Sequence, residues 1–394
     1  MPDGPLTNSP GAGAGRLWIA RLALQDYRNH PMTALSLDHR SVVLTGSNGA
    51  GKTNLLEAIS LLAPGRGLRN AAYADLDHSQ GGRPWALSAR VETRFGEITI
   101  ATGGRPQSPA AQKTSRVVKV DGVQVAGSGA LADYLDVSWL TPAMDGLFVG
   151  PASERRRFID RLCLCFDPGH RKRNAHYERA MRQRNRLLEM NDESSPALFE
   201  GLETQMAEVG VAIAAARLTT VQNLNGAILR GREARGSTFP WAVLGLDGTL
   251  EAMLEDMAAV DVEDVYRQRL AETRERDRAA RRALEGPHRS DLTVRHGPKD
   301  LSARTCSTGE QKALLVGLVL AHARLVKQMN EGYAPIVLLD EIAAHLDARR
   351  REALFSDIQQ LEVQAWMTGT DQSMFAPLRE CAQFFEIEDG QVVI

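Results

Sequence analysis

The pattern of apolar and polar residues near the start of the chain predicts short strands followed by a helix. Residues 17–24 and 35–38 have the character of strands, and residues 41–44 form an apolar strand that runs into glycines. Residues 52–63 follow, with apolar side chains at the spacing of one helix face. The predicted order is therefore strand, glycine-rich loop and helix.

The middle of the chain changes from strand patterns to helix patterns. Turn signals at Phe95-Gly96 and Asp121-Gly122 each join two runs with strand character, which predicts antiparallel hairpins. From about residue 151 to residue 285 charged residues are frequent and β-branched runs are few. The predicted strands are residues 85–94, 97–101, 116–120 and 123–125, and the predicted helices are residues 155–161, 175–190, 197–230 and 262–284.

Alternation of helix and strand resumes at the end of the chain. A terminal hairpin is expected around Asp389-Gly390. The other expected elements are helices at residues 310–327 and 348–361 and strands at residues 336–339 and 364–367. An α/β fold with a helical insertion explains this order.

Composition indicates a folded protein without a strong charge bias. The chain has 394 residues, enough for two or three domains, with 43% hydrophobic and 24% charged residues. Its 47 Lys and Arg against 49 Asp and Glu give a net charge of −2, so any nucleic-acid contact needs a local basic patch. The four cysteines, Cys163, Cys165, Cys306 and Cys381, have neither a zinc-binding spacing nor a secretory disulfide pattern.

No targeting or membrane segment is evident. The first sixteen residues are rich in Gly, Pro and Ala and lack the continuous apolar core of a signal peptide, so we expect a loose tail. The longest apolar run, residues 313–321, is far shorter than the roughly 20 residues that a membrane span requires. We expect a cytoplasmic protein that does not contact a membrane.

A phosphate-binding loop follows the strand at residues 41–44. The segment matches G-x-x-x-x-G-K-[ST] between a strand and a helix, the context that supports this motif over an ordinary glycine-rich turn. Inward-pointing N–H groups and the helix N-terminus favour phosphate. Lys52 would reach the β- and γ-phosphates, and the Thr53 hydroxyl would bind Mg²⁺. The predicted ATP-binding residues are Gly46, Ser47, Asn48, Gly49, Ala50, Gly51, Lys52 and Thr53.

Two carboxylates end the apolar strand at residues 336–339. A buried parallel strand would place Asp340 beside the Mg²⁺, directly or through water, and Glu341 would orient and deprotonate the attacking water. A core strand followed by a solvated helix cap is the alternative. We predict Glu341, Lys52 and Asp340 as catalytic residues, with Thr53 and Asp340 as the Mg²⁺ ligands.

Ser307 and Glu310 form the S-x-x-E pattern of a capping box before an apolar helix. ABC-type ATPases carry their signature at this position, one helix before the acidic strand, where the serine meets the γ-phosphate bound by a second subunit. The two interpretations are compatible because a capped helix start is still an anion site.

Two weaker patterns surround the last predicted helix. His345-Leu346-Asp347 has the spacing of a D-loop after the acids, and Thr370 follows the last strand where a switch residue would sense the γ-phosphate. An ordinary helix start and a polar loop are the alternatives.

Cations are concentrated between residues 154 and 186, where eleven Lys and Arg accompany four carboxylates. This excess predicts a phosphate-binding surface, with a solvated helix face as the alternative. The candidate DNA contacts are Arg155, Arg156, Arg157, Arg171, Lys172, Arg173, Arg182 and Arg184.

Together these motifs resemble the RecF family, bacterial recombination-mediator ATPases of the ABC/SMC-like class. The resemblance is highly specific because it rests on a series of motifs in the family's order along nearly the whole chain. The matching segments are residues 27–29, 46–70, 150–160, 177–188, 286–292, 307–315 and 338–347.

The resemblance implies an ABC/SMC-like P-loop ATPase head, with an antiparallel β lobe, built from both ends of the chain around an inserted helical arm. We accordingly expect head residues 1–150 and 291–394 and arm residues 151–290. It also implies an ATP-dependent homodimer that binds gapped, double- and single-stranded DNA and works with RecO and RecR to load RecA, with slow hydrolysis resetting the dimer. By position, the resemblance places Arg28, Asn48 and Thr370 near the nucleotide. It also implies that Ser307, Gly309 and Gln311 act in trans.

The chain departs from the family pattern at several points. Asp340-Glu341 replaces the family's paired aspartates, which could alter the hydrolysis rate, and Ser290 replaces a usual aspartate. Residues 141–151 are irregular, and no Q-loop residue is assigned there.

An ABC-type ATPase subunit of another system is the alternative function. A transporter subunit would separate loop and signature by far less than the 254 positions between Lys52 and Cys306. A small-molecule kinase would need a phosphoacceptor lid and no signature. A DNA-binding module with a decayed ATPase is disfavoured by the intact Lys52, Thr53, Asp340 and Glu341.

Overall fold

The computed structural model describes residues 15–78, 83–105, 116–190, 196–235, 240–343 and 346–393. Residues 1–14 of the predicted tail and His345 of the predicted D-loop lie outside these ranges. The chain divides into two compact units, one of residues 1–142 and 323–394 and one of residues 143–322. We call them the head unit and the arm unit.

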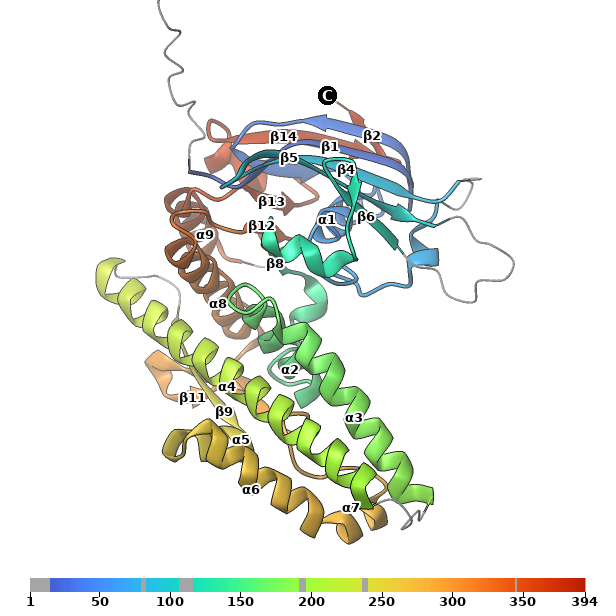
Figure 1. The fold of residues 1–394 in the computed structure, drawn as a ribbon. Coiled ribbons are helices and arrows are strands. Elements are labelled where there is room, and N and C mark those ends of the chain that lie inside the picture. The colour runs from blue at the N-terminus through green and yellow to red at the C-terminus, as the bar shows by residue number, and fades with distance from the viewer. Residues whose placement is uncertain are drawn as a thin grey trace, which may run out of the picture. The chain divides into compact units, whose positions relative to one another are not determined.

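A mostly parallel sheet forms one layer of the head unit (Figure 1). Its strands run in the order β15-β14-β3-β13-β12-β8, and they are parallel except for the terminal hairpin of β14 and β15. All residues of β3, β12 and β13 are buried, as expected for central parallel strands. The bounds are β3 Ser41–Thr45, β8 Val137–Leu140, β12 Ile336–Leu339, β13 Ala365–Thr368, β14 Ala382–Glu388 and β15 Gln391–Val393.

An antiparallel sheet in the order β2-β1-β4-β5-β6-β7 forms the β lobe of the head unit. The predicted turns at Phe95-Gly96 and Asp121-Gly122 join β4 to β5 and β6 to β7. The bounds are β1 Trp18–Tyr27, β2 His30–Ser36, β4 Ala86–Thr93, β5 Gly96–Gly104, β6 Arg116–Val120 and β7 Val123–Gln124.

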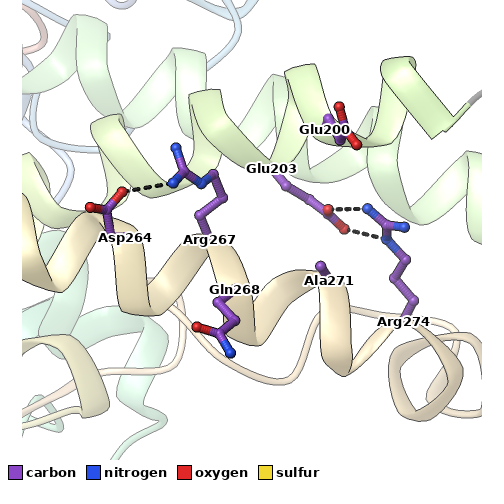
Figure 2. A pocket seen from close by; sticks show the side chains of 7 residues that line it. All are labelled: Glu200, Glu203, Asp264, Arg267, Gln268, Ala271 and Arg274. Carbon is purple, nitrogen blue, oxygen red and sulfur yellow. Dashed lines mark hydrogen bonds and ion pairs between the residues drawn. The ribbon is translucent and has the colours of Figure 1, made fainter.

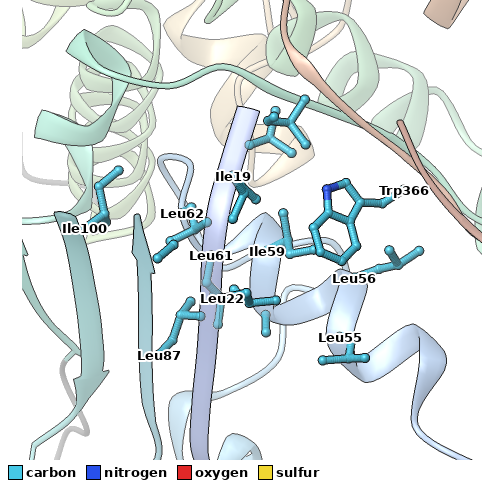
Figure 3. Close-up of a cluster of buried hydrophobic side chains, with 14 of the residues drawn as sticks. Ile19, Leu22, Leu55, Leu56, Ile59, Leu61, Leu62, Leu87, Ile100 and Trp366 are labelled. Carbon is cyan, nitrogen blue, oxygen red and sulfur yellow. The ribbon is translucent and has the colours of Figure 1, made fainter. Parts of the chain in front are cut away.

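Helix α1, Lys52–Ser60, is buried within the main core of the head unit (Figure 3). Its Leu55, Leu56 and Ile59 share one cluster with Ile19 and Leu22 of β1, Leu87 of β4 and Trp366 of β13. Both sheets therefore pack on the helix that follows the glycine-rich loop, and this packing sets the position of the loop. The head unit also contains α9, Ala348–Leu361, and the 3₁₀ helices Tyr73–Leu76, Ser128–Asp133 and Gln372–Leu378.

The arm unit consists of helices and a small antiparallel sheet in the order β11-β10-β9. Helix α4 packs along α3 and α6 (Figure 1). The helices are α2 Ala152–Cys163, α3 His170–Met190, α4 Pro196–Arg235, α5 Thr249–Asp256, α6 Ala259–Glu272 and α7 Arg274–Ala280, with 3₁₀ helices Gly297–Lys299 and Ala303–Thr305. The 3₁₀ helix Pro142–Met144 crosses the boundary between the two units. The strands are β9 Ala242–Asp247, β10 Asp291–His296 and β11 Leu301–Ser302. Helix α8, Thr308–Met329, begins in the arm unit and ends in the head unit.

The structure differs from the predicted elements in several places. Strands β8, β9, β10 and β11 and helix α5 are not among the predicted elements; all are short, and the strands are defined by pairing with other strands. The helix expected at 262–284 is divided into α6 and α7 at Thr273, whose backbone leaves the helical conformation. The resemblance places residues 143–150 and 291–322 in the head, but they group with the arm unit. For residues 291–296 the reason is that β10 pairs with β9.

The segment of residues 286–292 forms a largely buried joint in the arm unit, although Arg289 is exposed. The carbonyl of Pro287 accepts a hydrogen bond from Arg217 at 2.6 Å, and the carbonyl of Ser290 accepts one from Arg156 at 2.7 Å. A side chain at Gly286, which has φ 126°, would overlap the hydroxyls of Tyr177 and Tyr266. This segment, one of those that resemble the RecF family, is therefore required for packing of the arm unit.

Among the helices of the described residues, none is both long enough and apolar enough to cross a bilayer.

His322 of α8 is a fully buried histidine within the arm unit. Its Nε2 lies 3.2 Å from the carbonyl oxygen of Leu162, and its ring packs edge-on against Phe166. Burial lowers the pKa of His322 to about 4. The folded state therefore requires the neutral ring.

Acidification should destabilise the protein through His322. Because its folded pKa lies below the unfolded value of about 6.5, the unfolded state gains protons first as the pH falls from 6.5 toward 4, which costs about 1 kcal/mol at pH 5.5. Urea unfolding of His322→Gln should show a smaller loss of stability between pH 7.5 and pH 5.5 than the parent. His176→Gln, at an exposed site on α3, is the control. An equal loss in His322→Gln and the parent would contradict this account.

Candidate functional site

Three neighbouring parallel strands bring the predicted catalytic residues to one edge of the sheet. In the register, Thr368 of β13 pairs with Leu44 of β3, and Leu339 of β12 pairs with Met367 of β13. The segments that follow β3, β12 and β13 therefore leave the sheet side by side. Open α/β sheets bind ligands at this carboxyl edge.

The glycine-rich loop joins β3 to α1 and presents an exposed tip. Ser47, Asn48 and Gly49 are exposed, and α1 begins at Lys52 without a side-chain cap. The first N–H groups of α1 and its positive end are thus suited to an anion. The contact predicted for Asn48 stays a prediction.

Lys52 and the two strand-end acids share this edge. The Lys52 ammonium is buried and donates to the carbonyls of Gly46 and Ser47 at 2.8 and 2.7 Å. Burial lowers its pKa, an effect that the nearby carboxylates of Glu341 and Asp340 oppose.

Thr53 and Asp340, the predicted Mg²⁺ ligands, are in direct contact. The Thr53 hydroxyl donates to Oδ1 of Asp340 at 2.9 Å. A hydroxyl and a carboxylate are hard oxygen donors that suit Mg²⁺, which usually keeps water and phosphate oxygens as its other ligands. The described residues contain no group of three or more His, Cys, Asp or Glu placed for a metal. The Mg²⁺ contacts of Thr53 and Asp340 stay predictions.

Thr368, for which the sequence predicts no role, contacts both acids. Its hydroxyl lies 2.8 Å from Oδ1 of Asp340 and 2.8 Å from the backbone nitrogen of Glu341. A threonine at the end of a buried strand has no distinctive sequence signal, because β-branched residues are common there. By contrast, Thr370 is exposed in the following loop, and its switch role stays a prediction.

Residues at the start of β2, in the turn before it and in the terminal hairpin contact the backbone carbonyls at the end of the loop. The carbonyl of Ala50 accepts hydrogen bonds from the Asn29 amide at 3.0 Å and from the Gly390 N–H at 2.8 Å. Nε2 of His30 lies 3.0 Å from the Gly51 carbonyl, and its Nδ1 lies 2.7 Å from the Gly390 carbonyl. Burial lowers the pKa of His30. The loop thus depends on both ends of the chain.

Arg28 forms a bidentate ion pair with Glu57 of α1, with both distances 2.9 Å. The Glu57 carboxylate is fully buried, and Arg69 contacts it at 3.2 Å. Arg28 therefore fixes α1 against the β lobe, and its predicted place near the nucleotide stays a prediction.

The predicted signature segment forms the capping box. Oε2 of Glu310 accepts from the Ser307 N–H at 3.0 Å, and the Ser307 hydroxyl lies 2.9 Å from the same oxygen. Gln311 is buried and donates to the Cys306 carbonyl at 2.9 Å. Ser307 is exposed. The trans roles of Ser307, Gly309 and Gln311 stay predictions.

Two of the candidate DNA contacts are wrong. Arg184 is fully buried and paired with Glu203 at 3.0 Å and Asp277 at 2.7 Å. Arg155 is also buried, forms a bidentate pair with Asp291, and donates to backbone carbonyls. Both guanidiniums form their ion pairs and hydrogen bonds inside the arm unit, so neither is available to bind a DNA phosphate.

The other cations of the cluster are accessible to differing degrees. Arg156 and Arg173 are half-buried, and they bind the Ser290 carbonyl and the Asp167 carboxylate. The exposed candidates are Arg157, Arg171, Lys172 and Arg182. The possible phosphate-binding surface is thus smaller than the sequence indicates.

A pocket of about 550 Å³ lies between α4 and α6 in the arm unit (Figure 2). Four of its charged side chains pair with one another: Glu203 with Arg274, and Asp264 with Arg267 at 2.7 Å. None of the predicted site residues lines the pocket, so it is not the candidate site.

Comparison with known proteins gives one family along nearly the whole chain. The model of the RecF/RecN/SMC N-terminal domain matches residues 18–392. A DNA replication and repair protein RecF from Mesorhizobium japonicum is 52% identical over 374 residues, covering 95% of this chain and 97% of the relative.

Solved structures of the same class share the fold. The recombination mediator protein RecF-ATPrS of the RecFOR pathway has a TM-score of 0.80 at 21% identity, covering 95% of this chain and 97% of that chain. An SMC head bound to the C-winged helix domain of ScpA has a TM-score of 0.55 at 15% identity, covering 95% and 97%. The predicted fold class, an ABC/SMC-like head with an antiparallel β lobe and an inserted helical arm, is confirmed.

Gly390→Ala should weaken ATP binding. The new Cβ would overlap the carbonyl oxygen of Asn29, so the turn that supports Ala50 must move. The Kd for ATP, measured by calorimetry, should rise by about 10-fold or more, equivalent to ~1.4 kcal/mol.

Gly122→Ala is the matched control for this substitution. Gly122 occupies the same position of an Asp-Gly turn, with φ 80° against 76° for Gly390, but has open space around it. Both substitutions carry the cost of an alanine at positive φ. Equal ATP affinities for the two variants would show that the hairpin does not support the loop.

Proposed function

Because the chain belongs to the RecF family of DNA replication and repair proteins, we propose that it is an ATP-driven, DNA-binding homodimer of recombinational repair. The observation that carries this proposal is the grouping of Lys52, Thr53 and Asp340 at adjacent strand ends, beside an uncapped helix start. The similar structure of RecF-ATPrS supports a nucleotide at such a site.

ATP hydrolysis follows from the roles available to these side chains. Lys52 would exchange its loop carbonyls for the β- and γ-phosphates, while Thr53 and Asp340 would hold Mg²⁺. An Mg²⁺ ion held there would supply positive charge that neutralises the phosphates. Glu341, next to Asp340, would orient the attacking water and accept its proton. The rate would be slow, as expected for a cycle whose product is a conformational state.

Homodimerisation would complete the ATP site. Each chain carries one phosphate-binding loop and one signature, and Ser307 stands exposed at the start of α8. If the signature of one copy meets the nucleotide of its partner, two sites form around a twofold axis. ATP would then hold the two copies together until hydrolysis releases them.

DNA would bind the dimer through exposed cations of the arm unit. Arg157, Arg171, Lys172 and Arg182 lie exposed on α2 and α3. Such contacts neutralise phosphates without reading sequence, which suits recognition of gapped, double- and single-stranded DNA. In the cytoplasm, the DNA-bound dimer would act with RecO and RecR to load RecA at gaps.

Substitutions at the ATP site should separate nucleotide binding, dimerisation and hydrolysis. Glu341→Gln removes the proton acceptor but keeps the side-chain shape, so it should bind ATP, dimerise and hydrolyse on the order of 10²-fold more slowly. Ser307→Arg should bind ATP but remain monomeric, and Lys52→Ala should lose both properties. Light scattering with ATP and a turnover assay measure these effects.

Two results would count against this function. Normal ATP-dependent dimerisation of Ser307→Arg would remove the signature from the interface. Near-normal hydrolysis by Glu341→Gln would assign the proton acceptor elsewhere and leave Asp340 as the functional acid of the motif.

Reversing three exposed arm cations should weaken DNA binding while ATP binding survives. In the variant Arg171→Glu, Lys172→Glu, Arg182→Glu, affinity should fall alike for different sequences, and the salt dependence should flatten by about one unit of slope per lost contact. The control reverses three exposed β-lobe cations, Arg21, Arg90 and Lys119. Unchanged salt dependence in the arm variant would mean that this surface is only solvated.

A further inference from the structure

Thr368 occupies a strand position that adjoins both halves of the proposed ATP site. Strand β13 lies between β3, which leads into the phosphate-binding loop, and β12, which ends at the acids. Thr368 is the last residue of β13, and only 1% of it is exposed. Its hydroxyl is thus shielded from water and must find its partners within the protein.

The hydrogen-bond partners of Thr368 determine the direction of its single proton. The backbone nitrogen of Glu341 can only donate, so the Thr368 oxygen accepts from it at 2.8 Å. The hydroxyl proton must then point to Oδ1 of Asp340, also at 2.8 Å. The same Oδ1 receives the Thr53 hydroxyl, and no hydrogen bond from the described residues reaches Oδ2. The Asp340 carboxylate is therefore held by one oxygen, with the other available.

Glu341 has a backbone conformation that needs support. Its φ is 54°, in the left-handed region that residues other than glycine seldom adopt. The hydrogen bond from its N–H to Thr368 restrains this conformation, which sets the direction in which the Glu341 side chain leaves the strand. Unusual backbone conformations of this kind persist where the surrounding structure imposes them.

We propose that Thr368 is a positioning residue for ATP hydrolysis: its one hydroxyl fixes the Asp340 carboxylate and the left-handed backbone of Glu341 together. This inference rests on the proposed ATPase function and extends it to a residue outside the recognised motifs. Thr368 would act through Glu341 and Asp340 and would not contact the nucleotide. A loss of its hydroxyl should therefore affect turnover more than ATP affinity.

Thr368→Val tests this role because valine keeps the shape and removes the hydroxyl. The kcat for ATP hydrolysis should fall by about 10-fold or more, a part of the 10²-fold or larger effect typical of a general base. The Kd for ATP should change less than about 3-fold, since Lys52 and the loop have other partners. Thr368→Ser, which restores a hydroxyl, should recover most of the parent kcat.

Thr102→Val is the matched control for loss of a buried hydroxyl in the head unit. Thr102 is 4% exposed, and its hydroxyl donates to the Val117 carbonyl at 2.8 Å in the β lobe. This variant should lose stability comparable to that of Thr368→Val and retain the parent kcat. A purely structural role of Thr368 predicts the same behaviour for both variants, and that result would overturn the proposal.

Two further comparisons keep the test decisive. In a Glu341→Gln background, Thr368→Val should reduce the residual rate by a smaller factor than in the parent, because the part of its effect that acts through Glu341 is already lost and only the part through Asp340 remains. If Thr368→Val does not fold, Thr368→Cys and Thr368→Ser replace it: the weakly donating thiol should lower kcat, and the serine should not. Equal rates for that pair would overturn the proposal. A parent protein whose hydrolysis does not depend on Glu341 would instead contradict the proposed function itself.

Discussion

The parallel register of β3, β13 and β12 is the constraint on which the head unit depends. Strands from residues 41–45, 336–339 and 365–368 lie side by side, and all their residues are buried. Parallel neighbours end at the same edge of the sheet. Lys52, Asp340 and Thr368 therefore lie near one another at that edge, although they are far apart in the chain. A shift of one residue in this register would turn each buried side chain to the other face and separate the loop from its acid.

The glycine-rich loop is held by the tertiary structure more than by its own sequence. The Lys52 ammonium donates hydrogen bonds to loop carbonyls. Asn29, His30 and Gly390 contact the carbonyls of Ala50 and Gly51. Helix α1, which the loop precedes, is buried against both sheets and anchored by the ion pair of Arg28 with Glu57. The loop is thereby preorganised, which lowers the entropy cost of binding a phosphate.

The arm unit shows why a cluster of cations is not by itself a binding surface. Arg184 pairs with the buried carboxylates of Glu203 and Asp277, and its removal would leave an unpaired charge in the interior, which typically costs about 3–5 kcal/mol. Arg155 is itself buried and pairs with the partly exposed Asp291. The two guanidiniums join α3 to α4 and α7, and α2 to β10. The cluster therefore contains two groups of cations. Those inside the arm unit pair with carboxylates, and the exposed ones on α2 and α3 remain available to contact phosphates.

The sequence by itself determined the strand, loop and helix around Lys52, the acidic strand end at Asp340, the capping box at Ser307 and the terminal hairpin, because each depends on local spacing and turn chemistry. Only the tertiary structure decided the hydrogen bonds of Thr368, the pairing of Arg28 and the burial of Arg184. The strands β8 and β9 and the joint at Gly286 also depend on partners distant in the chain. A residue's type fixes which bonds it can make, but burial and the nearest partner decide which of them it does make.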